Sequence, residues 1–155
     1  MNAALLHGSP QSTQILFDAQ VLPASDPEFE GMKMPDGPAG EMATQMKGPA
    51  KRYVVSLIVN AQGLAYNQMP DGSRQAKIQF VLMAYDSGGK RVNYVESGYT
   101  SNVKPEEFSP EGEAGIRVRL LLDMPAGENS LRIAVHDLAA GRAGSLEIPV
   151  TVPAK

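Results

Sequence analysis

Apolar and polar side chains alternate along most of this sequence, a period of two that suits a β-strand and not a helix. In the stretch QILFDAQVL, every second residue from Ile15 to Val21 is apolar, whereas Asp18 and Gln20 point to the other face. No apolar pattern of helical period continues beyond about one turn. The alternating segments are 14–22, 51–60, 75–86, 90–99, 115–123, 130–137 and 145–152.

This pattern predicts an all-β fold, namely a seven-stranded antiparallel β-sandwich of the immunoglobulin or fibronectin-III type. Residues 1–155 are expected to form one domain, because a chain of this length can enclose one sizeable core. The Cys–Trp–Cys signature of antibody domains is missing, since the sequence has neither residue. The prediction therefore depends on the number and period of the strands. It requires Phe80, Leu120 and Ile133 to be buried.

Two stretches depart from the regular strand pattern. Pro149 lies within the last segment, and proline cannot donate a hydrogen bond to a neighbouring strand, so that strand should be at a sheet edge, or Pro149 should face its free side. Residues 23–50 form a long loop after the first strand that is rich in Met, Pro and Gly. A loop of this length is unusual in a compact domain, and we expect a functional loop, a disordered insertion or a flap over one sheet. Residues 1–12 are expected to be loosely ordered.

The pair His136–Asp137 resembles a metal-binding or proton-transfer pair, but its position in a strand argues against both roles. Adjacent residues of a strand point to opposite faces, so the two side chains cannot converge on one ion. The only other histidine is His7, near the N-terminus. We therefore expect Asp137 to end its strand and accept hydrogen bonds from the following turn, LAAGRAG, with His136 on the surface.

Composition excludes several classes of function. The net charge is -3 and no basic cluster is present, which argues against nucleic-acid binding. The absence of cysteine rules out disulfides and thiolate metal sites. No apolar run is long enough for membrane insertion. The start of the chain lacks the basic region of a signal peptide, so the chain is either not exported or a domain of a longer exported protein. No catalytic motif is present, and we predict a protein that is not an enzyme and has no cofactor.

Several of the same segments carry a resemblance to a known family. The stretch LLLDMPAGENSLRIAVHDLAAGRAGSLEIPVTVP contains the Pro-Ala-Gly turn at 125–127, a strand from Leu131 to Asp137, a GRAGS loop at 141–145 and a closing strand. The hairpin LMAYDSGGK at 82–90 and the segment 7–23 follow the same arrangement. In these features the chain resembles the C-terminal β-sandwich region of secreted acidobacterial proteins related to the von Willebrand factor A domain.

The resemblance implies an accessory β-sandwich in an exported protein, located outside the cytoplasm. Proteins of this family usually carry an A domain before this region, with an Asp-x-Ser-x-Ser metal-adhesion motif. That motif does not occur in this sequence, so metal-dependent adhesion is not carried over.

A stripe of apolar residues marks a candidate interaction surface. Val81, Met83 and Tyr85 point away from the core face of their strand, and Arg132 is the remaining candidate of this surface. An apolar stripe of this kind is normally covered, by the chain's own loop, by a neighbouring domain or by a protein partner. Self-coverage is the simplest expectation. Pairing of edge strands would also allow a dimer.

The function predicted from these observations is a non-catalytic binding, interaction or spacer module of an exported bacterial protein. Its partner would be another domain of the same protein or a separate protein. The alternative is a periplasmic β-sandwich that binds Cu(I) through its Met-rich loop, because thioether sulfur suits that ion. The candidate ligands are Met32, Met34, Met42 and Met46. A carbohydrate-binding role is disfavoured, since Trp is absent and aromatic residues make up only 6% of the chain.

Overall fold

The computed structural model describes residues 14–41, 49–60, 64–105 and 115–154. Within these ranges the chain forms β-strands and one short 3-10 helix, which confirms the all-β prediction. The elements are β1 (Phe17–Pro23), η2 (Pro27–Phe29), β2 (Ala50–Val59), β3 (Asn67–Gln68), β4 (Arg74–Asp86), β5 (Arg91–Val103), β6 (Ile116–Pro125), β7 (Gly127–Asp137) and β8 (Arg142–Val152).

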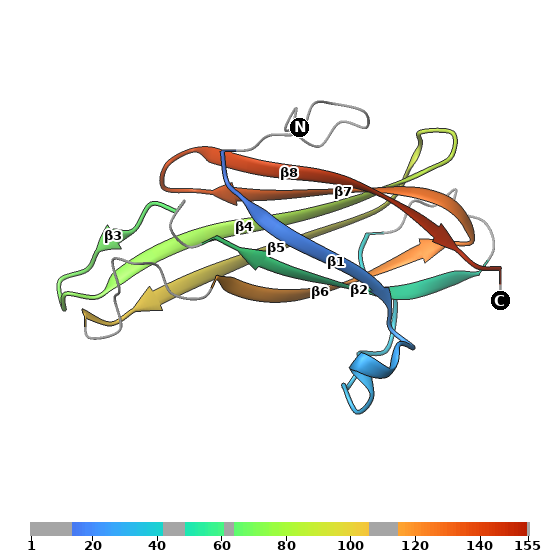
Figure 1. Cartoon of the computed structure of the whole chain (residues 1–155), viewed down its shortest axis with the longest axis horizontal. Coiled ribbons are helices and arrows are strands. Elements are labelled where there is room, and N and C mark those ends of the chain that lie inside the picture. Colours follow the sequence, from blue (N-terminus) through green and yellow to red (C-terminus); the bar gives the residue numbers. More distant parts are fainter. Residues whose placement is uncertain (1–13, 42–48, 61–63, 106–114, 155) are drawn as a thin grey trace.

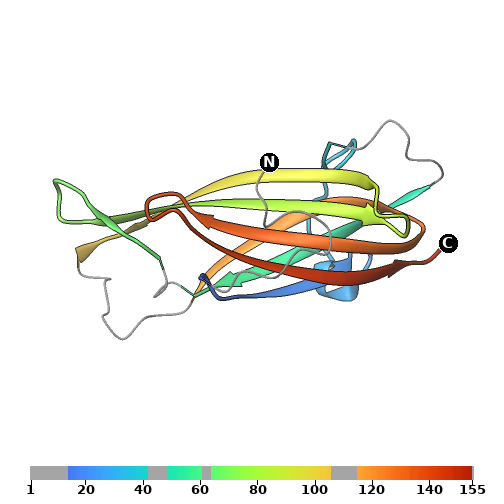
Figure 2. The same cartoon turned by 90° about the horizontal axis from the view of Figure 1, so that it is seen from above.

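The strands form two antiparallel sheets that face each other as layers (Figures 1 and 2). The small sheet has the order β1-β2-β6. In the large sheet β4 pairs with β5 along one edge and with β3 and β7 along the other, and β8 follows β7. The edge strands are therefore β5 and β6 on one side of the sandwich, and β1 and β8 on the other.

The core lies between the two sheets, where the alternating pattern placed it. Phe80 and Ile133 of the large sheet are fully buried, and Leu120 of the small sheet is 9% exposed. All three belong to one hydrophobic cluster that takes residues from both sheets. Burial of these inward faces is the main favourable contribution to folding, at roughly 25 cal/mol for each Å² of apolar surface removed from water.

The described residues form eight strands, not the seven expected. The additional strand, β3, has only two residues, which pair with Gln75 and Arg74 at the start of β4. Two residues are too few for an alternating pattern, and both are exposed, so no hydrophobic signal marks this strand. The seven longer strands all coincide with the segments that alternation identified.

The long loop after β1 is, in its described part, a flap that contacts both the small sheet and one side of the sandwich. Asp26 caps η2 by accepting a hydrogen bond from the Glu28 N–H (2.9 Å). Phe29 is buried, and the Arg119 guanidinium lies 5.3 Å from the centre of its ring. This part of the loop therefore covers some of the outer face of the small sheet.

Residues 35–41 continue across the side of the sandwich where β5 and β6 are the edge strands. Ala39 and Asp123 of β6 exchange two hydrogen bonds, from the Ala39 N–H to the carboxylate (2.9 Å) and from the Asp123 N–H to the Ala39 carbonyl (3.1 Å). The Glu41 N–H then donates to the carbonyl of Tyr94 in β5 (2.7 Å). The flap thus joins the two sheets and closes this side.

A buried polar cluster holds the flap in place. The Arg52 side chain donates to Asp123 (Nε–Oδ1, 2.9 Å) and to the carbonyls of Pro35 and Gly37. The amide of Asn93, which is fully buried, donates to the carbonyls of Ala39 and Asp123. A Cβ on the next flap residue, Gly40, would lie 2.3 Å from the Asn93 Oδ1, and that glycine has a φ of +109°, so only glycine fits there.

Replacing Asp123 by alanine is expected to lower the free energy of unfolding by about 2 kcal/mol, because it removes one member of a partly buried charged network. Hydrogen exchange should also accelerate at the Glu41 amide, whose bond to β5 depends on the position of the flap. Denaturant unfolding and amide exchange measure the two effects. Glu30→Ala is the matched control, since Glu30 is exposed on the same flap. Unchanged hydrogen exchange at Glu41 in the Asp123 variant would show that the polar cluster of Arg52, Asn93 and Asp123 does not hold the flap in place.

Candidate functional site

On the opposite side of the sandwich, between β1 and β8, the described residues are in close contact at one end. A Cβ on Gly144 would lie 2.0 Å from the carbonyl oxygen of Ile15, so the backbones of these two segments are in close contact there. The Ala143 N–H donates to the Gln14 Oε1 (3.1 Å) beside this contact. Beyond it, β1 and β8 run in the same direction and diverge (Figure 1).

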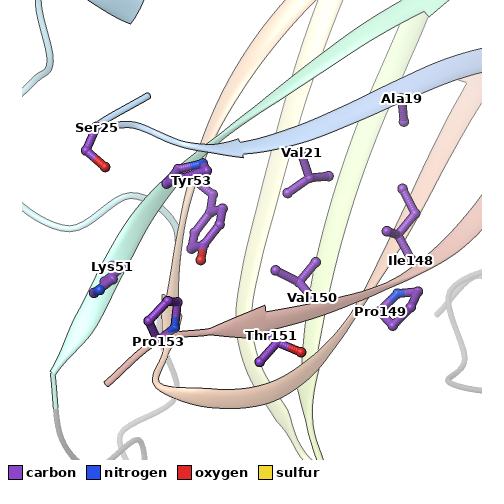
Figure 3. A pocket seen from close by; sticks show the side chains of 11 residues that line it. Ala19, Val21, Ser25, Lys51, Tyr53, Ile148, Pro149, Val150, Thr151 and Pro153 are labelled. Atoms are coloured by element: carbon purple, nitrogen blue, oxygen red, sulfur yellow. The ribbon is translucent and has the colours of Figure 1, made fainter. Parts of the chain in front are cut away.

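Where the two strands diverge, they enclose an open groove of about 510 Å³. Ala19 and Val21 of β1 form one wall, Ile148 and Val150 of β8 form the other, and the Tyr53 ring of β2 lies between them. Figure 3 shows the side chains of Val21 and Val150 pointing toward each other across the groove. The four wall residues are only partly buried although they pack against the core. The groove therefore exposes apolar surface that continues into the interior.

On the side away from β2, no strand in the described part of the chain pairs with the backbone of β1. In an antiparallel pair, residues alternate between pairs that exchange two hydrogen bonds and pairs that exchange none. The Asn60 N–H donates to the Leu16 carbonyl and the Ala24 N–H donates to the Arg52 carbonyl, so the even-numbered residues of β1 bond to β2. The N–H and C=O groups of Ala19 and Val21 consequently point away from β2, at the edge of the small sheet that borders the groove.

The facing edge of β8 has fewer donors. Pro149 has no N–H, and the Ala143 N–H points toward β1, which places the odd-numbered residues of β8 on the groove side. Along the groove, β8 therefore offers the N–H of Thr151 and the carbonyls of Pro149 and Thr151. Among the described strands, β8 pairs with β7 alone, which confirms that Pro149 lies in an edge strand.

Polar side chains gather at the wide end of the groove. Lys51 is the one charged residue that lines it, and Ser25 lies nearby (Figure 3). Burial raises the pKa of the Tyr53 hydroxyl above its ordinary value, so this group stays neutral at physiological pH and can act as a donor. The groove thus combines apolar walls, unpaired backbone groups on one edge and a single cation at its mouth.

The structure does not leave the predicted interaction surface open to a partner. Val81, Met83 and Tyr85 are 4%, 3% and 7% exposed, and they form a buried cluster with Ala134. Arg132 is 1% exposed. These side chains are buried in the folded chain, in a cluster formed by residues of neighbouring strands, and their role in an interaction stays a prediction. Alternation does not separate the two faces of β4 from Phe80 to Tyr85, because both faces are buried there, whereas Lys77 on the outer face is exposed.

The methionines proposed for copper are only partly described. Met32 and Met34 are half-buried on the flap, whereas Met42 and Met46 lie outside the described residues. Binding of Cu(I) by these methionines therefore stays a prediction. Across the described ranges, no three His, Cys, Asp or Glu side chains are grouped so that they could hold a metal ion.

Asp137 has the structural role predicted for it. Its carboxylate accepts hydrogen bonds from the N–H groups of Ala139 (3.1 Å) and Ala140 (3.3 Å) in the following turn. It also accepts one from Ala65 (2.6 Å), which belongs to the connection between β2 and β3. His136 points to the other face and is half-buried, and this burial lowers its pKa. The pair does not form a metal or proton-transfer site.

The groove itself was not predicted from the sequence, although its parts were visible there. The four wall residues belong to the inward faces that alternation identified, and Pro149 marked an edge strand. No sequence signal states which two edges face each other. No family model matches this chain, and no curated protein matches its sequence. Within the described residues, no helix has the length and apolar character needed to cross a membrane.

Proposed function

We propose that this chain is a non-catalytic binding module that accepts an extended polypeptide segment of a protein partner in the groove between β1 and β8. The observation that carries the proposal is the combination of unpaired N–H and C=O groups on β1 with half-buried apolar side chains on both walls. An extended segment satisfies both, because its backbone pairs with the edge strand and its alternate side chains enter the apolar space.

The strand order supports an immunoglobulin or fibronectin-III type of sandwich. Counting only the seven long strands, the first, second and fifth form the small sheet, and the third, sixth and seventh lie side by side in the large one. Constant-type immunoglobulin domains divide their strands in the same way, apart from the fourth, which here joins the large sheet. Domains of this architecture commonly serve as modules of cell-surface proteins.

The proposed context is an exported bacterial protein. Its support is the resemblance of residues 120–153 to the closing segment of secreted von Willebrand factor A-related proteins. In that context the segment bound in the groove would come from another domain of the same protein or from a separate protein. The earlier idea that a sheet face serves as the docking surface is replaced by the groove, since Val81, Met83 and Tyr85 are buried.

The binding role is tested by titrating labelled protein with a short, end-capped peptide of alternating valine and threonine. The NMR resonances of the Ala19 and Val21 amides should shift, and these amides should exchange more slowly with solvent, because they gain partners on the peptide. Ala19→Pro is the matched variant: it removes a donor that faces the groove and leaves the bonds of Asp18 and Gln20 to β2 intact. It should weaken peptide binding while the spectrum of the core stays unchanged. Absence of any change at Ala19 and Val21 with wild-type protein would refute the proposal.

A further inference from the structure

The charge and backbone chemistry of the groove also restrict what kind of segment it accepts. We infer that the bound segment pairs with β1 and carries an acidic side chain that meets Lys51 at the wide end. This inference rests on the proposed function, and it names the partner's chemistry: two apolar residues at alternate positions, followed at the next alternate position by Asp or Glu.

Pairing with β1 follows from the number of backbone groups on each edge. Along the groove, β1 offers the N–H groups of Ala19 and Val21, whereas β8 offers only that of Thr151, because Pro149 has none. An added strand therefore forms more hydrogen bonds on β1 than on β8. Its inward-facing residues would then lie opposite Ala19, Val21 and Pro23.

The acidic residue follows from the position of Lys51. This residue shares the inward face of β2 with Tyr53, which is opposite Pro23, the last residue of β1. Lys51 comes two residues before Tyr53 and so lies past the point where β1 ends, and both side chains line the groove (Figure 3). Within the described part of the chain, no carboxylate is within ion-pair distance of Lys51, whereas the neighbouring Arg52 is paired with Asp123. A carboxylate on the residue opposite Pro23 would supply the missing counter-charge at the edge of an apolar site.

The experiment compares end-capped peptides that differ at one position, acetyl-Val-Thr-Val-Thr-X-Thr-amide with X as Glu, Gln or Lys, together with the same peptides in reversed order. The Glu peptide should bind wild-type protein about three- to tenfold more tightly than the Gln peptide in at least one order, and the Lys peptide should bind least. Added salt should reduce the difference.

Lys51→Met should abolish the preference for Glu, since methionine keeps an apolar side chain of similar length without the charge. Lys90→Met is the control of equal net charge, because Lys90 is exposed at the turn between β4 and β5. It should leave the preference intact.

The outcomes separate this inference from the proposed function. Equal binding of the Glu and Gln peptides, with Ala19 and Val21 still protected, overturns the inference and keeps the binding role. Protection of Thr151 in place of Ala19 and Val21 overturns the pairing with β1. If no peptide protects these amides, both proposals fail. Protection of these amides that rises with protein concentration, without peptide, would identify a second copy of the chain as the occupant. Tighter binding of dodecanoate than of every peptide would identify an acyl chain as the occupant. Either result overturns the inference.

Discussion

Replacing Asp137 by alanine is expected to lower the free energy of unfolding by about 3 kcal/mol, the largest effect of any single side chain considered. The carboxylate is 1% exposed and accepts three backbone hydrogen bonds. These bonds join the turn between β7 and β8 to the connection before β3. Without them, the N–H of Ala65 loses its partner in a half-buried position, and the turn loses both of its side-chain caps.

Thermal unfolding measures this effect directly, with an expected decrease in melting temperature of about 6–12 °C for a domain of this size. Asp137→Asn should cost roughly half as much, because the amide keeps one acceptor oxygen but places an NH₂ group against the remaining donors. Glu128→Ala is the control on the same strand, since Glu128 is exposed and should tolerate the change within about 0.5 kcal/mol. If Asp137→Ala lowered the melting temperature no more than Glu128→Ala does, the carboxylate would not hold the two segments together.

Replacing Gly144 by alanine is expected to cost about 2 kcal/mol and to separate the beginnings of β1 and β8. The added Cβ would lie 2.0 Å from the Ile15 carbonyl oxygen and 3.0 Å from its carbon. Both are backbone atoms, so no side-chain rotation can relieve the clash and one of the two strands has to move.

The control is Gly98→Ala on β5, where an added Cβ meets nothing within 4 Å. Its effect should be neutral or slightly stabilising, because alanine restricts the unfolded chain more than glycine does. Chemical denaturation measures both variants. Amide exchange at Ala143 reports on the junction itself, since that N–H donates to Gln14 across it. Wild-type stability combined with wild-type protection of Ala143 would mean that β1 and β8 do not approach as closely as described.

The contrast between the two sides of the sandwich has a functional consequence. The side between β5 and β6 is covered by the chain's own flap, held by Arg52, Asn93 and Asp123. On the side between β1 and β8, the described residues show a close contact at one end, at Gly144, and an open groove beyond it. An extended segment can therefore add to the second side without displacing any described part of the chain.

The candidate site could be predicted only in fragments. Alternation placed Val21 and Val150 on inward faces, which is correct, but it also implied that they would be as fully buried as Phe80. They are only partly buried, because each lies in an edge strand, where the opposite sheet no longer covers it. The polar clamp at Asp123 was not visible either, because its partners lie far apart in the sequence and none belongs to a recognisable motif. The stripe at Met83 was identified as apolar, and only the folded chain reveals that it is already buried.

The sequence alone determined the long strands, their inward faces, the edge position of Pro149 and the turn role of Asp137. Each of these depends on interactions between residues close together in the chain, where side-chain period and turn chemistry act directly. Tertiary structure decided which edges face each other, which side the flap covers and where the apolar groove remains open. Those features arise from contacts between distant segments, such as Ile15 with Gly144 and Arg52 with Asp123, which no local pattern specifies.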